Sequence, residues 1–383
     1  MGTKKIYVLQ IGMTPNPGGI EAYVMNLYKK IDRHKVQFDF VDWCGNEDIA
    51  FGAEIRRLGG HIFKIPSRQD NYLENKRAVN KLVASGKYSY TYNNLNSLSN
   101  ITGITSTYGI ANVTPIIHAH NDNIEEGKMI AKFLDKVHKP YVNFRKGVRL
   151  ACSRNAGKWM FPHKEFSVVA DSIDTLAFKY TDKTRKLYRH ELGLENKLVV
   201  GSVARFGPQK NLPFLIKVFQ QLCETVENAI LLLVGAGEQE EQLRKQVIET
   251  GLNSRVHFLG ARTDTANLMQ AMDLLIAPSI FEGFGMSVLE AQCAGLPCYV
   301  SEAFHPEVLQ TSLVKKISLE LSPACWSDCI RNDLQVRATQ KRLAFDAVIK
   351  EKGYDSRESA ARLQDKLLSG FREKGNYRGE SYQ

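Results

Sequence analysis

The sequence predicts an α/β protein built from two Rossmann-like, doubly wound parallel-sheet domains that face each other across a cleft. Short apolar runs alternate with segments of helical periodicity, which is typical of parallel sheets with right-handed crossovers. The alternation is interrupted once, by a charged stretch at residues 179–191, and then restarts. The length of 383 residues also exceeds what a single core usually holds. We therefore expect two sheets and not one long one.

The first half of the chain holds seven expected strands. Its opening apolar run ends in Gly12 and leads through a loop rich in proline and glycine into a helix. Three apolar residues of that helix, Ile20, Val24 and Leu27, recur at helical spacing. The expected strands are residues 5–12, 37–43, 61–65, 88–92, 114–120, 148–153 and 167–170, and a further helix is expected at residues 76–84.

The second half repeats this pattern after the charged stretch, which itself predicts one helix. Apolar residues at Leu212, Leu215 and Phe219 have the spacing of a helix that packs on a sheet. The expected strands are residues 198–203, 229–234, 256–259, 274–277, 297–300 and 314–317.

These patterns divide the chain into two domains. Residues 1–174 form the expected N-terminal domain and residues 197–350 the C-terminal domain, with residues 175–196 as a connector. A helix at residues 351–372 is expected to pack back on the N-terminal domain, and the polar residues 373–383 are expected to fray.

Composition excludes several classes of protein. The chain is 43% apolar and 24% charged, which is ordinary for a globular protein, and no apolar run approaches the roughly 20 residues that span a bilayer. The seven cysteines are odd in number and lack zinc-type spacing, so we expect reduced thiols. The N-terminal apolar run is too short for a signal peptide, and a cytoplasmic location is therefore expected.

The formal net charge of +10 predicts an acidic partner. The sequence shows no zinc-finger spacing, no RNP-like aromatic strand and no basic zipper helix, so nucleic acid is not expected as that partner. Phosphorylated small molecules or an anionic membrane surface agree better with the charge.

The stretch with the most chemistry runs from Phe281 to Glu290. It follows the apolar run at residues 274–277 and predicts a strand, a glycine-spaced loop and a helix. Glycine amides and the first turn of a helix can bind a phosphate. Glu282 and Glu290 bracket this loop and are placed to reach hydroxyl groups of the same ligand. Spacing alone leaves one alternative open, in which Ser287 and Glu290 form a capping box for the helix.

Other candidate residues follow strands in both domains, where doubly wound sheets bind their ligands. Arg205 and Lys210 share one loop and are candidates for gripping a diphosphate, although isolated cations of this kind are usually solvated. His120 ends a strand of the first domain and is a candidate proton shuttle, with a buried, hydrogen-bonded histidine as the alternative. Gly18 and Gly19 would place open amides at the start of the first helix.

Taken together, and in the order in which they follow one another along the chain, these motifs resemble the signature of the retaining GT-B glycosyltransferases of glycosyltransferase family 4. The resemblance covers nearly the whole chain, and a part of it is most similar to the capsular and exopolysaccharide branch. It rests on residues 281–291, which contain Glu282 and Glu290, and continues through residues 18–21, 203–211, 233–237 and 256–260; the branch is indicated by residues 19–21, 26–28 and 37–40.

The resemblance implies a nucleotide-sugar donor linked to uridine diphosphate. It also implies a glycan acceptor, such as a polyprenyl-diphosphate-linked saccharide, in bacterial capsule, exopolysaccharide or O-antigen assembly. Residues 1–174 would be the acceptor side and residues 197–350 the donor side. Sugar transfer would retain the anomeric configuration through front-face attack, without a metal or another cofactor, because cations and helix amides can neutralise the departing diphosphate.

The resemblance also assigns roles to single residues. His120 and Glu282 are the implied catalytic residues: His120 lies near the anomeric carbon, and Glu282 contacts the transferred sugar and is not a nucleophile. Arg205 and Lys210 would bind the diphosphate, and Glu290 would hold the ribose hydroxyls. The full implied donor-binding set is Gly19, Arg205, Lys210, Gly283, Phe284, Gly285, Met286, Ser287 and Glu290.

Two segments depart from the family pattern. Residues 170–174 read Ala-Asp-Ser-Ile-Asp where many relatives have Asn-Gly-Ile-Asp, so the hinge is expected to differ. Residues 88–96 replace a strand end that often carries a histidine, and we expect them to form a loop that recognises the acceptor. Asp264, in Asp-Thr-Ala, is expected to cap a helix and not to bind a metal.

Residues 125–149 carry seven Lys or Arg against three Asp or Glu. Lys128, Lys132 and Lys136 recur at four-residue spacing beside an apolar helical stripe. Such a helix could rest on an anionic membrane and hold the protein on the inner face of the cell membrane, or the stripe could pack into the core. The stripe consists of Met129, Ile130, Phe133, Leu134 and Val137.

Two other functions are compatible with the same residues. One is a nucleotide-sugar 2-epimerase or hydrolase on the same fold, which would act on the donor without an acceptor. The other is a non-catalytic partner subunit, against which the complete set of charged candidates argues.

Overall fold

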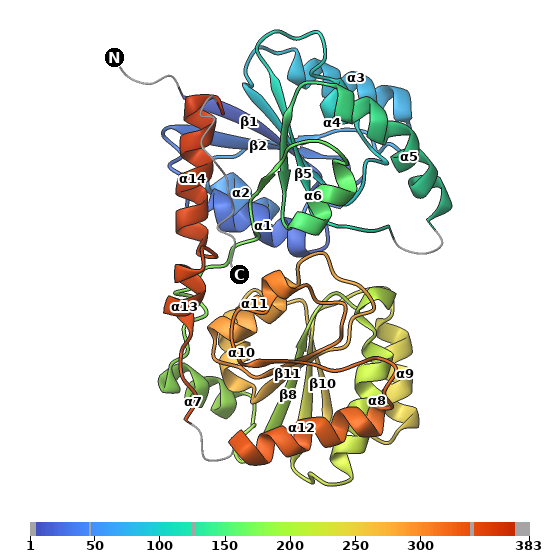
Figure 1. Ribbon diagram of the computed structural model, residues 1–383, viewed down its shortest axis with the longest axis vertical. Helices are drawn as coiled ribbons and strands as arrows, with labels where there is room; N and C mark the ends of the chain where they lie inside the picture. The colour runs from blue at the N-terminus through green and yellow to red at the C-terminus, as the bar shows by residue number, and fades with distance from the viewer. Residues whose placement is uncertain (1–4, 46, 125–127, 338–340, 372–383) are drawn as a thin grey trace. The chain divides into compact units, whose positions relative to one another are not determined.

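The computed structural model describes residues 5–45, 47–124, 128–337 and 341–371. The chain divides into two compact units (Figure 1). Unit 1 comprises residues 1–172 and 356–383, and unit 2 comprises residues 173–355. The terminal segment 373–383, which was expected to fray, lies outside the described residues.

Unit 1 is built on a seven-stranded parallel sheet with the order β3-β2-β1-β4-β5-β6-β7. The chain winds outward from β1 to β3, then returns to the other side of β1 and continues to β7, which makes the sheet doubly wound. Its strands are β1 (Ile6–Ile11), β2 (Val36–Asp42), β3 (Ile62–Lys64), β4 (Tyr90–Leu95), β5 (Thr114–Ala119), β6 (Val148–Ala151) and β7 (Ser167–Val168).

Helices cover both faces of this sheet (Figure 1). On one face, residues such as Tyr23 and Leu363 pack against Phe38 in a single buried cluster. On the other face, Val79 and Val83 pack against strand residues. The helices of unit 1 are α1 (Gly19–Tyr28), α2 (Gly52–Arg57), α3 (Tyr72–Val83), α4 (Thr102–Thr105), α5 (Met129–Phe144), α6 (Arg154–Met160) and α14 (Ser356–Ser369).

Unit 2 contains a six-stranded parallel sheet with the order β10-β9-β8-β11-β12-β13. Its strands are short apolar runs, and all six residues of β9 are buried because helices lie on both faces. The strands are β8 (Leu198–Val203), β9 (Ala229–Val234), β10 (Val256–Gly260), β11 (Leu274–Ala277), β12 (Cys298–Val300) and β13 (Val314–Lys316).

The helices of unit 2 form two layers. One large cluster joins Phe219, Leu243 and Trp326 of three helices to the sheet. The charged segment expected as a connector contains one helix, α7, whose Arg189 pairs with Asp273 at 3.1 Å within unit 2. The helices are α7 (Asp182–Glu191), α8 (Leu212–Cys223), α9 (Glu240–Glu249), α10 (Thr265–Ala271), α11 (Met286–Cys293), α12 (Pro323–Arg337) and α13 (Asp346–Glu351), with short 3-10 turns η1 (Pro208–Lys210) and η2 (Pro306–Val308).

The observed architecture confirms the predicted fold class, two doubly wound parallel-sheet units. The strand expected at residues 88–92 is found as β4, two residues later at Tyr90–Leu95, so the acceptor loop expected at residues 88–96 is mostly buried strand. The second half of the strand escaped prediction because it contains two buried polar residues, whose side chains bond inside unit 1. Asn93 Nδ2 donates to Ile116 O at 3.0 Å, and Asn94 Nδ2 donates to Gln10 Oε1 at 3.0 Å.

The apolar stripe of α5 faces solvent. Met129, Ile130 and Phe133 are 74%, 78% and 66% exposed, and Val137 is exposed as well. The alternative in which this stripe packs into the core is therefore wrong, and Leu134 alone of its five residues is half-buried. The buried residues of α5 are Asp135, Asn143 and one apolar residue, Val142. Within the described ranges, no helix is long and apolar enough to cross a lipid bilayer.

Candidate active site

The glycine-spaced loop enters α11 through a residue with left-handed backbone. Gly285 is the N-cap, with φ of +96°, and a Cβ at this position would lie 2.6 Å from the Phe304 ring. The helix therefore begins at Met286, and its first turn contains no acidic residue. The capping box considered for Ser287 and Glu290 is absent, because Ser287 lies inside the helix and Glu290 in the second turn.

The main-chain amides at this helix start are open. Within the described ranges, the amides of Gly283 through Ser287 donate no hydrogen bond. The first intrahelical bonds run from Val288 and Leu289 to Gly285 O, at 3.0 and 3.4 Å. Open amides at a helix N-terminus, together with the helix dipole, favour an anion such as a phosphate.

Lys210 and Glu282 lie in different loops and form an ion pair. Lys210 Nζ lies 2.7 Å from Glu282 Oε1, and Ser279 Oγ donates a bond of 2.7 Å to the same oxygen. Glu282 is only 6% exposed, so its charge needs a partner inside the protein. The lysine ammonium has three donors, and Lys210 can therefore keep Glu282 while it also binds a ligand oxygen.

The loop of Lys210 is tied directly to the strand end beside Glu282. Gln209 Nε2 donates to Phe281 O at 2.8 Å, and the Ile280 amide donates to Gln209 O at 2.8 Å. These two bonds hold together loops that lie 72 residues apart in the sequence. The ion pair is therefore positioned by the backbone and not by two flexible side chains alone.

Glu290 has a different environment from Glu282. Its side chain is half-buried, and none of the described residues forms a hydrogen bond or ion pair with it. Loss of surrounding water raises the pKa of Glu290 to about 8. A carboxyl group in this state gains free energy from any ligand hydroxyl that hydrogen-bonds to it.

Arg205 lies at the surface of the same unit. Its Nη2 lies 3.0 Å from Glu238 Oε2, and both side chains are more than half exposed. Such exposed pairs contribute about 0–1 kcal/mol, so Arg205 can exchange Glu238 for a ligand phosphate at little cost.

In unit 1, His120 lies in a buried cluster just beyond the end of β5. Its Nε2 hydrogen-bonds with Asn94 Oδ1 at 3.2 Å, and its Nδ1 lies 3.5 Å from Asp171 Oδ1 without a hydrogen bond. The rings of Tyr23 and His118 lie 5.0 and 4.1 Å from the His120 ring, centroid to centroid. His120 is thus a buried, hydrogen-bonded histidine, as one alternative held, and it keeps one nitrogen without a hydrogen bond.

The neighbouring His118 is held neutral. Tyr92 Oη hydrogen-bonds with His118 Nδ1 at 3.0 Å and with Tyr23 Oη at 2.9 Å. Burial, followed by the charge that His120 can carry, holds the pKa of His118 well below its usual range. A positive charge on His118 is therefore disfavoured.

Gly19 opens α1 directly after the N-cap residue Gly18. A Cβ built at Gly19 would meet no atom within 4 Å. The loop before it is filled by Glu21, which is 4% exposed and accepts bonds from the amides of Thr14 and Gly18 at 2.8 and 3.0 Å. The surface at Gly19 is therefore open, while an internal carboxylate already occupies the anion-binding part of this loop.

Sequence reasoning missed several residues that complete these sites. Ser279 follows β11 and bonds Glu282, and its place directly after a proline and a buried strand was the available signal. The contacts of Asn94 and Asp171 with His120 join segments that lie 26 and 51 residues from it in the sequence, so no local pattern could reveal them. Asp264 lies at the N-cap of α10, but its carboxylate pairs with Arg262 at 2.6 Å and does not cap the helix.

In the described part of the chain, no group of three or more His, Cys, Asp or Glu side chains is arranged to hold a metal ion. Whether the reaction is metal-independent stays a prediction.

Residues 184–314, which include most of these candidates, match the family model described as Glycosyl transferases group 1. The chain is 29% identical to EpsF of Bacillus subtilis, over 95% of this chain and 96% of that protein. It is 32% identical to UDP-Gal:alpha-D-GlcNAc-diphosphoundecaprenol alpha-1,3-galactosyltransferase of Escherichia coli, over 40% of this chain and 42% of that protein.

The fold is also that of solved glycosyltransferase structures. HepE of Anabaena in complex with UDP-glucose superposes with a TM-score of 0.78 at 22% identity, covering 95% of this chain and 100% of that one. WaaG, a glycosyltransferase involved in lipopolysaccharide biosynthesis, superposes with a TM-score of 0.71 at 16% identity, covering 94% and 99%. The chain therefore has the GT-B fold of these glycosyltransferase structures, and its residues 184–314 match the group 1 glycosyltransferases.

Proposed function

We propose that this protein is a retaining, metal-independent glycosyltransferase that moves a sugar from a UDP-sugar to a lipid-linked glycan. The proposal places it in family 4, in capsule, exopolysaccharide or O-antigen assembly. The observation that carries it is the row of open amides from Gly283 to Ser287, beside the Lys210–Glu282 pair. The names of two similar proteins support the substrates: HepE binds UDP-glucose, and the Escherichia coli relative joins a UDP-sugar to a diphosphoundecaprenol-linked sugar.

In this proposal, unit 2 binds the donor. The amides of residues 283–287 and the cations of Lys210 and Arg205 bind the diphosphate, so that the charge of the departing nucleotide is neutralised as it forms. The carboxyl group of Glu290 forms hydrogen bonds with the ribose hydroxyls. Its raised pKa is lowered again when polar ligand groups replace the missing water.

Glu282 binds the transferred sugar and does not attack it. Its Oε1 already accepts bonds from Lys210 and Ser279, and a carboxylate oxygen engaged in this way is a poor nucleophile. His120 is proposed to lie near the reacting sugar; its Nδ1, which has no hydrogen bond in this structure, is buried beside Asp171. Gly19 allows donor or acceptor atoms to approach the α1 backbone closely, because no protein atom lies near its missing side chain.

The helix α5 is proposed to rest on the inner face of the cell membrane. Its outward side combines exposed apolar residues, Ile130 and Phe133 among them, with Lys132 and Lys136. A soluble surface rarely exposes such a stripe without a partner, and the lysines fit anionic lipid.

Vesicle co-sedimentation tests this contact. The triple variant Lys128→Glu, Lys132→Glu and Lys136→Glu is expected to lose binding to vesicles rich in phosphatidylglycerol. Its matched control changes three exposed lysines of unit 2, Lys245→Glu, Lys315→Glu and Lys316→Glu, and should still bind. Equal binding of both variants would remove α5 from the membrane contact.

A transfer assay tests the function itself. With a panel of UDP-sugars and lipid-linked saccharides extracted from the source cells, Glu282→Ala should lose transfer by at least about 100-fold. Transfer that survives in this variant would refute the active site. Product formed from the donor alone, without acceptor, would instead support the 2-epimerase or hydrolase. UDP binding without turnover for every donor would support the non-catalytic subunit.

A further inference from the structure

The helices α3, α4 and α5 lie on the same face of the unit 1 sheet (Figure 1). Residues of all three line a groove. The crossover from β4 to β5 contains only α4, a helix of 4 residues, between α3 with 12 and α5 with 16. So short a helix does not fill the space between two long ones. The result is a cavity of about 820 Å³ with α4 as its floor, named here the α3–α5 groove. This volume lies within the range of small-molecule sites, about 300–1,000 Å³.

The groove runs along the strands of the sheet. Ser99 and Asn100 follow the carboxyl end of β4 and line one end of it, whereas Ala84 and Ile110 precede β4 and β5 and line the other. A strand of 6 residues such as β4 spans about 20 Å. A groove of this length accommodates several linked sugars.

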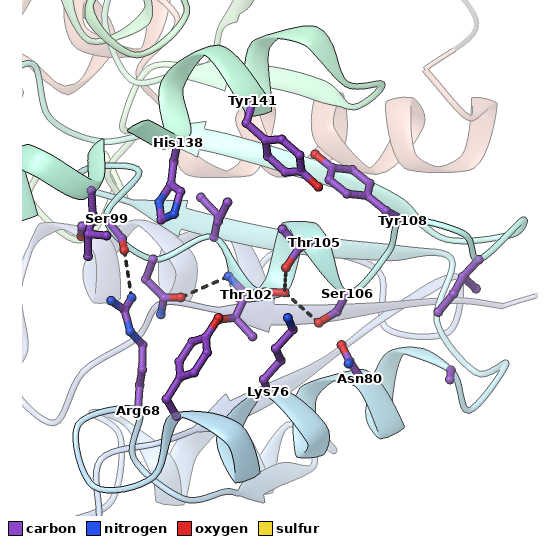
Figure 2. A pocket seen from close by; sticks show the side chains of 16 residues that line it. Arg68, Lys76, Asn80, Ser99, Thr102, Thr105, Ser106, Tyr108, His138 and Tyr141 are labelled. Carbon is purple, nitrogen blue, oxygen red and sulfur yellow. Dashed lines mark hydrogen bonds between the residues drawn. The ribbon is translucent and has the colours of Figure 1, made fainter. Parts of the chain in front are cut away.

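Three tyrosines from different elements line the groove. They are Tyr72 of α3, Tyr108 after α4, and Tyr141 of α5. Figure 2 shows Tyr108 and Tyr141 next to each other, edge to face, with ring centroids 5.9 Å apart. A tyrosine offers an apolar ring face to the C–H groups of a pyranose and a hydroxyl to its oxygens. Tyr108 Oη is buried without any partner among the described residues, which leaves an unmet hydrogen-bonding group in the wall.

The remaining lining is polar and basic. Asn80 and Thr105 offer neutral hydrogen-bonding groups, and Arg68 and Lys76 carry positive charge (Figure 2). Arg68 is held in place by a bond of 2.9 Å from its Nη1 to Ser99 O. None of the 16 lining residues is Asp or Glu. Such a groove suits a hydroxyl-rich ligand that carries negative charge.

We propose that the α3–α5 groove binds an acidic oligosaccharide, the part of the glycan that lies beyond the sugar taking part in transfer. This role rests on the proposed function, which needs a glycan acceptor. The groove adds affinity for longer chains, because each further sugar meets another tyrosine or amide along it. A phospholipid tail is a poorer fit, since hydroxyl, amide and charged groups make up most of the wall.

The test uses two variants on adjacent faces of α3. Tyr72 and Lys76 recur at four-residue spacing and line the groove, whereas Leu73 and Arg77 are exposed one position further along and do not line it. Tyr72→Ala with Lys76→Ala is therefore compared with Leu73→Ala with Arg77→Ala. Both pairs remove one large side chain and one charge, and alanine keeps the helix stable.

Binding of hexasaccharides of hyaluronan, alginate and polygalacturonate is measured by saturation-transfer NMR and titration calorimetry. We expect at least one to bind, with affinity rising from disaccharide to hexasaccharide. The groove variant should weaken it at least about tenfold, and the control should stay within about twofold. UDP should raise the melting temperature of all three proteins equally, because the donor site lies in unit 2.

Two results would overturn the proposal. One is equal hexasaccharide binding by the groove variant and the wild type. The other is no binding of any of the three hexasaccharides at about 5 mM while UDP still stabilises the protein. Failure of UDP binding in the wild type, with oligosaccharide binding that still depends on Tyr72 and Lys76, would count against the proposed donor and not against the groove.

Discussion

The starts of α1 and α11 look alike in sequence and differ in chemistry. Both helices follow a buried strand and begin after a glycine N-cap, Gly18 in one and Gly285 in the other. At α1, Glu21 turns back and accepts bonds from the loop amides, so a carboxylate of the protein already occupies the place of an anion. At α11 the first turn carries no acid, and the amides from Gly283 onward stay open.

This difference teaches where the charge of a ligand can be held. A glycine-led helix start binds an external anion only when the chain does not supply its own. The α11 start is therefore the proposed diphosphate site, and the α1 start offers space at Gly19 without offering a strong anion site. Each helix start can be altered separately, and UDP binding reports the result.

Alanine at the two glycines should have opposite consequences. Gly285→Ala places a Cβ 2.6 Å from the Phe304 ring, on a backbone with a φ of +96° that side chains rarely adopt, so the helix start has to shift. UDP binding should then weaken about 100-fold or more, which corresponds to ~2.7 kcal/mol. Gly19→Ala meets no atom within 4 Å and should keep both the fold and UDP binding. Calorimetric titration with UDP, after circular dichroism of both variants, gives the comparison. Equal affinities would remove the α11 start from the donor site.

The two cations of unit 2 should contribute unequally. Lys210 is partly buried and fixed by Glu282, whereas Arg205 is exposed in a weak pair with Glu238. We expect Lys210→Ala to weaken UDP binding about 10- to 100-fold and Arg205→Ala by less than that, because charge-assisted bonds contribute more when they are shielded from water. Titration with UDP and with uridine measures both. A larger loss for Arg205→Ala would reverse the assignment, and an equal loss with uridine would show that neither cation binds phosphate.

Removing the internal carboxylate of α1 should affect stability and not the donor. Glu21→Ala loses the bonds to the amides of Thr14 and Gly18, which should lower the free energy of unfolding by about 1–2 kcal/mol. UDP affinity should stay within about twofold of the wild type. Urea unfolding and UDP titration check the two parts. UDP binding that improves in this variant would mean that α1 competes for the same anion.

The pH dependence of stability should report on Glu290. Loss of surrounding water raises its pKa to about 8 in the folded protein, above the usual 4.5, so between these pH values the folded state holds a proton that the unfolded state has released. Below pH 4.5 the folded and unfolded states both hold this proton, so Glu290 does not change the free energy of unfolding. As the pH rises from 4.5 toward about 8, Glu290 lowers the free energy of unfolding progressively. Glu290→Gln removes the loss. Its melting temperature should therefore exceed that of the wild type at pH 8 and match it at pH 4.5.

A difference between Glu290→Gln and the wild type that does not change with pH would contradict this account. The matched control is Glu282→Gln, whose native carboxylate is already paired with Lys210. It should not gain stability as the pH rises.

Much of the fold was predictable because apolar runs and helical stripes report burial directly. β11 was expected at residues 274–277 and is found at Leu274–Ala277. β4 was placed too early, because its buried Asn93 and Asn94 are polar and find their partners, Ile116 O and Gln10 Oε1, only on the neighbouring strands of the folded sheet. Local pattern carries no information about such partners.

The candidate residues of the site were named from the sequence, but their surroundings were not. The Ser287–Glu290 cap was considered because its spacing is right, and it fails because the backbone of Gly285 starts the helix earlier. The stripe of α5 showed the right period for a helix, yet periodicity cannot say which face is buried. Asp135 and Asn143 lie on the buried side. That inversion gives α5 its exposed apolar surface.

The central claim is that the open amides before α11 hold the diphosphate of the donor. Selective ¹⁵N labelling of glycine and a titration with UDP observe Gly283 and Gly285 directly. The account predicts that both amide resonances move downfield as UDP saturates, while those of the surface-turn glycines Gly59 and Gly86 stay in place. Unmoved resonances of Gly283 and Gly285 at saturating UDP would contradict it.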